Sequence, residues 1–215
     1  MFPDLSRDDV FTLETARLWL RWPRVADAAA VQRLAGEKVV AEMTANIPHP
    51  YPDGAAETFI FNARKANALG DALSLAIALK GKPNALIGMI AAQPNDSGAL
   101  ELGFWLAEPL WGEGYMTEAA RSIIDTVFTL TDVREIVSAV RVINPASRRV
   151  QEKCGFRHEG SALRSAPARG GAFACDLFRL DRRTWEGLKA WGAYGLPIMG
   201  LKPPALFHRE MEAAG

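Results

Sequence analysis

The segment from Phe104 to Ala119 (Phe-Trp-Leu-Ala-Glu-Pro-Leu-Trp-Gly-Glu-Gly-Tyr-Met-Thr-Glu-Ala) joins an apolar strand end to a glycine-bearing loop and a predicted helix start. Gly112 and Gly114 have no β-carbon, so the backbone there can approach a ligand closely. The free N–H groups and the positive dipole end of the following helix would face that ligand and favour a phosphate or pyrophosphate. A strand-to-helix turn that binds nothing has the same pattern, so both interpretations remain open.

A second segment with chemically useful spacing runs Asn144-Pro-Ala-Ser-Arg-Arg-Val-Gln-Glu-Lys-Cys-Gly-Phe156. Asn144 is a predicted N-cap, the proline after it suits the first helical position, and Gly155 predicts the helix end. Ser147 follows Asn144 by three residues, so the two side chains share one helix face. The Ser147 hydroxyl is therefore either aimed at a ligand or used to satisfy a helix N–H.

Glu101 is a candidate general base. The apolar strand from Leu100 to Leu106 alternates in its side-chain direction, which divides the residues between two faces. One face carries Glu101, Gly103 and Trp105, and the other carries Leu100, Leu102, Phe104 and Leu106. A carboxylate at this place can take a proton from a reacting group. The alternative is a strand-end acid that faces solvent or pairs with an arginine.

Composition excludes several classes of protein. The chain has 215 residues, 49% of them apolar, which suits one domain with a substantial core. Its 25 basic and 25 acidic residues cancel, so no general affinity for nucleic acid or anionic membrane is expected. Cys154 and Cys175 form no metal-ligand spacing, and we predict no metal site. No signal-peptide pattern or apolar run of about 18 residues occurs, so a cytoplasmic protein is expected.

The predicted element order indicates the fold class. It runs strand, two helices, three-strand meander, helix, strand, helix, two strands and a final helix. The strands are predicted at 17–22, 73–79, 85–93, 100–106, 136–142, 156–163 and 172–180, and the helices at 28–35, from 53, 115–130, 144–155 and 181–191. Asp27, Asp53 and Asp181 are predicted helix caps. This order predicts an α/β (α+β) fold with a mixed, mostly antiparallel central sheet of about seven strands and helices on both faces.

These motifs resemble the GNAT superfamily of acetyl-coenzyme A-dependent N-acetyltransferases, and most of all its RimJ/RimL-like branch of ribosomal-protein N-terminal acetyltransferases. The resemblance covers roughly residues 12 to 181. Four segments carry it: Glu14 to Arg21, Ile47 to Asp53 with Phe59-Ile60, Glu101 to Leu106 with Gly112 to Ala119, and Asn144 to Phe156. The last segment is the most specific of the four, because it fixes an Asn, a Ser, a Glu-Lys pair and a Gly-Phe at set intervals.

The resemblance implies acetyl-CoA as cosubstrate and direct attack by a primary amine in a ternary complex. That amine is either a protein N-terminal α-amine or a small-molecule amine. The residues implied in cofactor binding are Trp105, Leu106, Trp111, Gly112, Glu113, Gly114, Tyr115, Met116, Thr117, Asn144 and Ser147. Glu101 is the implied base, direct or through water, and Ser147 the implied hydrogen-bond donor to the departing sulfur. A backbone N–H near Trp105 or Leu106 is the expected oxyanion donor. His49, in the proline-rich loop, is either a substrate-side residue or a solvated one.

Three positions depart from the family pattern. Trp111 stands where a Gln or Arg is usual, and Met116 stands in the last small position of the loop. Gln151 replaces a tyrosine that protonates the thiolate in many members, and a glutamine cannot do this. A non-catalytic acyl-CoA binding or sensing module of the same fold is therefore an alternative. A nucleotide-binding loop is disfavoured, since neither glycine-rich nucleotide motif is present.

The domain organisation and assembly state are predicted only broadly. Residues 1–191 are expected to form a single acetyltransferase domain, followed by an extension, 192–215, without a clear period. The chain is expected to be a monomer or a homodimer.

Overall fold

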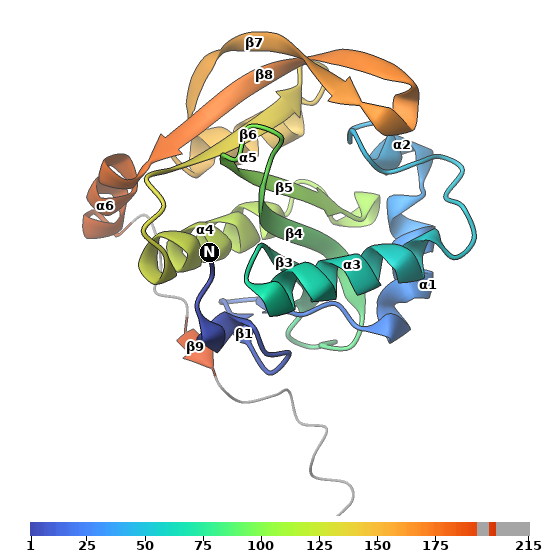
Figure 1. Cartoon of the computed structure of the whole chain (residues 1–215), viewed down its shortest axis with the longest axis horizontal. Helices are drawn as coiled ribbons and strands as arrows, with labels where there is room; N and C mark the ends of the chain where they lie inside the picture. The colour runs from blue at the N-terminus through green and yellow to red at the C-terminus, as the bar shows by residue number, and fades with distance from the viewer. Residues whose placement is uncertain (193–197, 201–215) are drawn as a thin grey trace, which may run out of the picture.

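The computed structural model describes residues 1–192 and 198–200, the last three by their backbone alone. Its centre is a nine-stranded sheet in the order β7-β8-β6-β5-β4-β3-β2-β1-β9 (Figure 1). Every neighbouring pair is antiparallel except β5 with β6, which is parallel. The strands are β1 (Thr12–Glu14), β2 (Leu18–Arg21), β3 (Leu73–Leu79), β4 (Leu86–Pro94), β5 (Leu100–Leu106), β6 (Glu135–Arg141), β7 (Arg157–Ala166), β8 (Gly171–Asp181) and β9 (Ile198–Gly200). The helices are α1 (Ala28–Ala35), α2 (Lys38–Ala41), α3 (Ala55–Leu69), α4 (Tyr115–Leu130), α5 (Pro145–Lys153) and α6 (Arg182–Ala190).

The predicted fold class is confirmed, and the sheet has two strands more than expected. Both additional strands, β1 and β9, have three residues, which is too few to show an alternating pattern in the sequence. They pair with each other, with Leu13 opposite Met199. A short part of the predicted 192–215 extension therefore belongs to the sheet. The rest of that extension lies outside the described residues.

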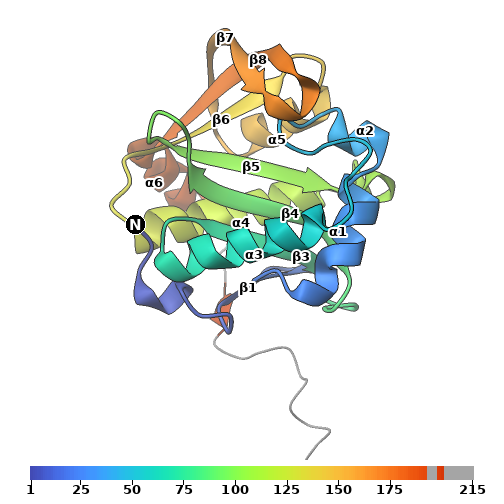
Figure 2. The same ribbon diagram turned by 45° about the vertical axis from the view of Figure 1, so that its right-hand side comes forward.

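Each face of the sheet is covered by helices, as predicted (Figure 2). On one face, α4 packs its buried side chains, such as Ile123 and Phe128, against Leu75 and Leu102. On the other face, α1 and α3 pack against Trp105 and its neighbours in β3 and β4. The alternation predicted in β5 therefore holds, since Leu102 and Trp105 lie in different clusters.

Two of the predicted helix caps are confirmed. The N–H of Ser147 donates to Asn144 Oδ1 at 3.0 Å, which caps α5. The N–H of Thr184 donates to Asp181 Oδ1 at 2.8 Å, which caps α6. Each cap satisfies a backbone donor that the first helical turn leaves free.

The predicted caps at Asp27 and Asp53 are wrong. Asp27 pairs with the guanidinium of Arg21 through two contacts of 2.8 Å, and both side chains are almost fully buried. The same carboxylate accepts from the Arg24 N–H at 2.7 Å, so it neutralises Arg21 and caps the 3-10 turn of residues 25–27, and it makes no side-chain cap bond to α1 itself. Asp53 accepts a hydrogen bond from Gln32 Nε2 at 3.0 Å, and α3 begins after Gly54 without a side-chain cap.

The central irregularity of the sheet lies between β5 and β6. Their ladder contains one residue pair, Glu101 with Val137, whereas β6 pairs with β8 along its whole length. Beyond that pair the two parallel strands separate toward their carboxyl ends. The backbone edge of β5 is therefore open from about Gly103 onward, in the middle of the protein.

Candidate functional site

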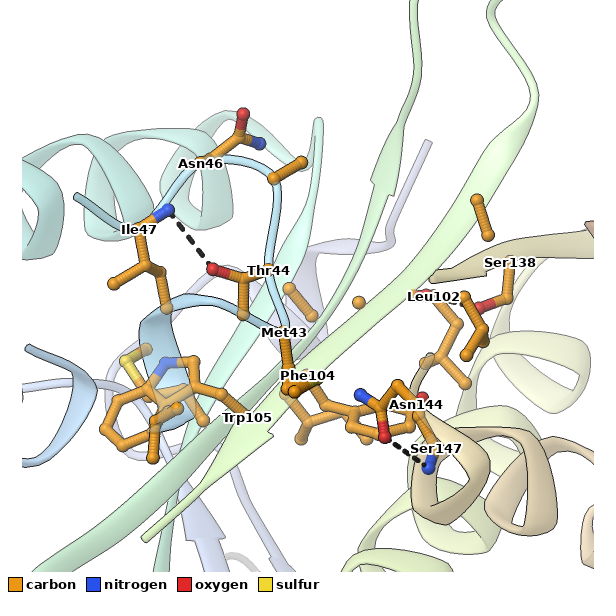
Figure 3. Close-up of a pocket in the computed structure, with 18 of the residues that line it drawn as sticks. Met43, Thr44, Asn46, Ile47, Leu102, Phe104, Trp105, Ser138, Asn144 and Ser147 are labelled. Atoms are coloured by element: carbon orange, nitrogen blue, oxygen red, sulfur yellow. Dashed lines mark hydrogen bonds between the residues drawn. The ribbon is translucent and has the colours of Figure 1, made fainter. Parts of the chain in front are cut away.

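A cavity of about 1120 Å³ lies where β5 and β6 separate. Figure 3 shows that β5 divides it, with Trp105 beside Met43, Thr44 and Ile47 on one side of the strand. Phe104 lies on the other side with Asn144 and Ser147 of α5. The cavity thus has two parts: a part between the strands and α5, and a part under the loop that follows α2. We call them the α5 side and the loop side.

The open edge of β5 presents free backbone groups to the α5 side. Ala107 N–H donates to Ile87 O of β4 at 2.9 Å. Since successive residues of a strand point their N–H groups in opposite directions, Phe104 and Leu106 point theirs toward the gap. Leu106, rather than Trp105, therefore has its N–H in the position expected of an oxyanion donor. The indole Nε1 of Trp111 donates to Leu106 O at 2.7 Å, so this carbonyl is already occupied.

The glycine loop leads from β5 into α4 and borders the same part of the cavity. Gly112 and Gly114 have φ angles of 86° and 79°, which a residue with a side chain rarely adopts. A β-carbon on Gly112 would meet no atom within 4 Å, so the space beside it is open. The first bond into α4 runs from Glu118 N to Gly114 O at 3.1 Å. The preceding N–H groups, those of Tyr115, Met116 and Thr117, have no intrahelical acceptor, as an anion site requires.

Arg17, immediately before β2, contacts this loop and holds it in place. Its Nη1 donates to Glu113 O at 2.9 Å, its Nε donates to Glu118 Oε2 at 2.6 Å, and its guanidinium lies 4.3 Å from the ring centre of Tyr115. Burial raises the pKa of Glu118, but hydrogen bonds from Thr15 and Arg17 outweigh this effect and hold the pKa below its ordinary value. The first turn of α4 therefore keeps a carboxylate whose charge is balanced by Arg17.

Helix α5 provides the opposite wall. Asn144, Ser147, Arg149 and Lys153 line the cavity there. The Ser147 hydroxyl has no hydrogen-bond partner among the described residues, so its single proton is available. Arg148 faces elsewhere and pairs with carboxylates of α5 and β8. Of the basic residues on this helix, Arg149 and Lys153 are thus the ones in place to meet a phosphate.

The loop side of the cavity contains Glu101. Its side chain is 24% exposed, and Oε2 accepts hydrogen bonds from Asn95 Nδ2 and from Arg164 Nη2, each at 3.1 Å. The pairing with an arginine, left open by the sequence, is therefore present. One carboxylate oxygen, Oε1, accepts no hydrogen bond from any described residue.

The β7–β8 hairpin contacts the loop that follows α2 and covers the loop side of the cavity. Arg169 Nη2 donates to Ile47 O at 2.7 Å, and Ala168 N–H donates to Ala45 O at 3.2 Å. Arg141 of β6 donates to Glu42 O and stacks 4.0 Å from the ring centre of Phe173. These contacts join two segments far apart in the sequence, which lie close together at the top of Figure 1.

Two predicted site residues lie outside the cavity. His49 is exposed, and its Nδ1 shares a hydrogen bond of 2.7 Å with Gly36 O, so its ring is held against the end of α1. Glu113 turns its side chain to solvent and takes part through its carbonyl group alone. The other predicted residues line the cavity: Glu101, Trp105, Leu106, Trp111, Gly112, Gly114, Tyr115, Met116, Thr117, Asn144 and Ser147.

Three residues of the site were not predicted from the sequence: Arg17, Ser138 and Arg164. Arg17 lies in the first of the resembling segments, but its spacing gives no sign of the glycine loop almost a hundred residues later. Ser138 donates to Leu102 O at 3.0 Å and accepts from Gln151 Nε2 at 2.8 Å. A serine in a buried strand is common, so nothing local marks it. Arg164 is one of many exposed arginines until the sheet brings it to Glu101.

Two further classes of site are absent from the described residues. No cluster of three or more histidine, cysteine or acidic side chains in that part of the chain could hold a metal ion. None of its helices is long and apolar enough to cross a lipid bilayer. Cys154 is buried, and burial raises the pKa of its thiol to about 12, which agrees with a space-filling role.

Sequence comparison finds relatives among acetyltransferases. YdaF of Bacillus subtilis (strain 168), whose name describes a candidate ribosomal N-acetyltransferase, is 32% identical over 106 residues, or 48% of this chain. That match spans 58% of YdaF, so a large part of that relative has no counterpart in the alignment. The N-acetyltransferase p20 of Bacillus licheniformis, itself uncharacterised, is 27% identical over 179 residues, which are 82% of this chain and 99% of p20.

Comparison of structures and of family models agrees with these matches. RimJ of Mycobacterium smegmatis, crystallised with a CoA disulfide, superposes with a TM-score of 0.69. It is 24% identical, and the match covers 85% of this chain and 95% of RimJ, which shows a shared fold. The model of the acetyltransferase (GNAT) domain matches residues 17–157, a span that contains β2 to α5 and therefore both strands and the helix that border the α5 side of the cavity. The chain belongs to the GNAT family of acetyltransferase domains.

Proposed function

We propose that this protein transfers the acetyl group of acetyl-CoA to a primary amine by direct attack while both substrates are bound. The separation of β5 from β6 carries this proposal, because it opens one cavity to two different kinds of wall. The α5 side offers free backbone N–H groups and basic side chains, which suit an anionic, amide-bearing cofactor. The loop side offers a carboxylate, which suits an amine.

The α5 side of the cavity has groups that suit the phosphates of acetyl-CoA and groups that suit its pantetheine arm. The open N–H groups before Glu118 and the bare backbone at Gly112 would hold the pyrophosphate. Arg149 and Lys153 would meet the 3′-phosphate. The open edge of β5 at Phe104 would pair with the amides of the pantetheine arm, as an added strand does.

Acetyl-CoA supplies the acetyl group as an activated thioester. In the transfer a C–N bond forms, the C–S bond breaks, and the proton lost by the amine is finally taken up by the thiolate. Glu101 Oε1 would accept the amine proton. The Leu106 N–H would stabilise charge on the carbonyl oxygen, and the Ser147 hydroxyl would donate to the sulfur.

The acceptor amine, the assembly state and the cellular setting are also proposed. The acceptor is a protein N-terminal α-amine or a small-molecule amine, and the single domain of residues 1–191 acts as a monomer or homodimer. We infer a cytoplasmic setting because Cys154 and Cys175, both buried, form no disulfide among the described residues. Amines with a pKa near 8, as α-amines have, would need less help from Glu101 than lysine side chains.

An acceptor screen tests the proposal. Thiol release from acetyl-CoA is measured with peptides that have free N-termini and with small amines, beside CoA binding by titration calorimetry. Turnover with at least one amine is expected, and Glu101→Gln should lower kcat while CoA affinity stays unchanged. Glu135→Gln is the matched control, because Glu135 pairs with Arg179 at 3.0 Å and lies outside the cavity. CoA binding without turnover on any amine would favour the alternative, a non-catalytic acyl-CoA binding module.

A further inference from the structure

Gln151 is a buried polar residue on the inner face of α5, with 1% of its surface exposed. Its Nε2 donates to Ser138 Oγ of β6 at 2.8 Å, and Ser138 Oγ donates to Leu102 O of β5 at 3.0 Å. These two hydrogen bonds cross from α5 to β5 next to the single ladder pair of β5 and β6, Glu101 with Val137. They therefore lie at the point from which the cavity opens.

These two hydrogen bonds determine which way the side-chain amide of Gln151 points. Leu102 O is a carbonyl oxygen and can only accept, so the single hydroxyl proton of Ser138 is committed to it. The Ser138 oxygen must then receive its second hydrogen bond from an N–H of Gln151. The carboxamide oxygen, Oε1, is consequently turned away from Ser138. It is buried and has no hydrogen-bond partner among the described residues.

An unsatisfied buried acceptor is unusual, and its position is informative here. Other described side chains also carry a buried polar atom without a partner, among them Trp22, Ser122 and Trp185. Gln151 is the one in this group that lines the cavity between β5 and β6. A buried acceptor beside a ligand cavity is satisfied when a ligand brings a donor.

Gln151 Oε1 needs a hydrogen-bond donor from a ligand in the cavity. The proposed function, on which this inference rests, places the pantetheine arm between β5 and α5. That arm contains two secondary amides, each with one N–H, and the neighbouring walls already provide donors for its carbonyl groups. We propose that Gln151 Oε1 accepts a hydrogen bond from a pantetheine amide N–H. In this proposal Gln151 binds the pantetheine arm of the cofactor, and the Ser147 hydroxyl donates to its sulfur.

Binding of a truncated ligand tests this role. Titration calorimetry compares CoA with 3′,5′-ADP, which has the 3′- and 5′-phosphates of the nucleotide but lacks the second phosphate of the pyrophosphate and the pantetheine arm. Gln151→Met keeps the length of the side chain and removes its acceptor. We expect this variant to bind CoA about tenfold more weakly, equivalent to about 1.4 kcal/mol, and to bind 3′,5′-ADP like the wild type. Unchanged CoA affinity, or an equal loss for both ligands, would overturn the proposal.

A matched control separates the position from the substitution. Gln32→Met makes the same change on α1, where the glutamine also has one side-chain hydrogen bond and does not line the cavity. It should bind both ligands like the wild type. A wild-type protein that binds neither CoA nor acetyl-CoA would instead refute the proposed function and leave no role for Gln151 to play.

A ligand variant tests the same contact in the wild-type protein first. CoA analogues are prepared with one or the other pantetheine amide N-methylated, and both are titrated into the wild-type protein. One analogue should bind about tenfold more weakly than CoA, and this penalty should disappear in Gln151→Met. A penalty of the same size in both proteins would mean that a bound water, rather than the arm, satisfies Oε1, and the proposal would fail.

Discussion

Replacing Arg17 with glutamine should weaken CoA binding by altering the glycine loop from outside the cavity. Arg17 does not line the cavity, but it contacts Glu113, Tyr115 and Glu118 in the loop and the first turn of α4. The substitution removes the donor to Glu113 O and leaves the Glu118 carboxylate without its counter-charge. A pyrophosphate in the loop would then face an unbalanced negative charge.

The protein contains a near duplicate of this arginine that serves as a control. Arg64 of α3 donates to Pro23 O at 2.9 Å, pairs with Asp9 at 2.8 Å, and lies 5.4 Å from the ring centre of Trp22. It thus has the same three kinds of partner, a carbonyl, a carboxylate and an aromatic ring. None of these partners belongs to the glycine loop or lines the cavity.

The two substitutions should cost similar stability and differ in binding. Each removes one hydrogen bond to a carbonyl, one partly exposed ion pair and one ring contact, which together contribute about 2 kcal/mol. For a chain of this size, such a loss lowers the Tm by about 4–8 °C. Arg17→Gln should in addition bind CoA about tenfold more weakly, a change of about 1.4 kcal/mol.

Thermal unfolding and titration calorimetry measure both effects. Because the loop is expected to bind phosphates, Arg17→Gln should lose affinity for CoA and for 3′,5′-ADP alike, unlike Gln151→Met. Arg64→Gln should bind both ligands like the wild type. If Arg17→Gln shows the expected fall in Tm and still binds CoA at full strength, then the loop does not depend on Arg17, and the reasoning is refuted.

Three further predictions concern the loop, its carboxylate and the α5 cap. Gly114→Ala and Gly98→Ala, at φ angles of 79° and 80° and without a close clash, should each lose about 1–2 kcal/mol of stability. Only Gly114→Ala should lower CoA affinity in calorimetry. Equal CoA binding by both variants would contradict the proposal that this loop binds the pyrophosphate. The pKa of Glu118 is lower in the folded protein than its ordinary value of 4.5, so its contribution is complete above that pH and is lost as pH falls through the folded pKa. The difference in unfolding free energy between wild type and Glu118→Gln should therefore be constant near neutral pH and shrink under acid, and a difference that grows there would contradict the sign. Asn144→Ala should lower the unfolding free energy by about 1 kcal/mol, with Asn144→Asp restoring it, as denaturant titration can show.

The parts of the fold that the sequence predicted are those with strong local signals. The strands β3, β4 and β5 are mostly apolar runs of seven or more residues between turn residues, and their observed bounds lie within a residue of the predicted ones. Helix α4 begins and ends at the predicted residues, since its apolar stripe is long and Gly114 precedes it. These features depend on residues that are close in the sequence.

The features that the sequence did not predict depend on side chains that meet only in the folded chain. Asp27 looks like a helix cap until Arg21 is seen to be buried beside it, and burial is a property of the folded chain. Glu101 meets Arg164, 63 residues later, because β5 and β7 belong to the same sheet. No spacing rule connects such pairs, so the site's outline was predictable and its charge pairing was not.

Two of the three departures from the family pattern, Trp111 and Gln151, act on the same strand. The indole N–H of Trp111 donates to the carbonyl oxygen of Leu106. Gln151 donates to Ser138, whose hydroxyl donates to the carbonyl oxygen of Leu102. At both ends of the open edge of β5, these carbonyl oxygens are therefore already occupied and are closed to an incoming donor. What remains open between them is the backbone of Phe104 and the N–H of Leu106. A ligand that adds to β5 as a strand can consequently take one register, with its amide opposite Phe104 and its reacting carbonyl at Leu106.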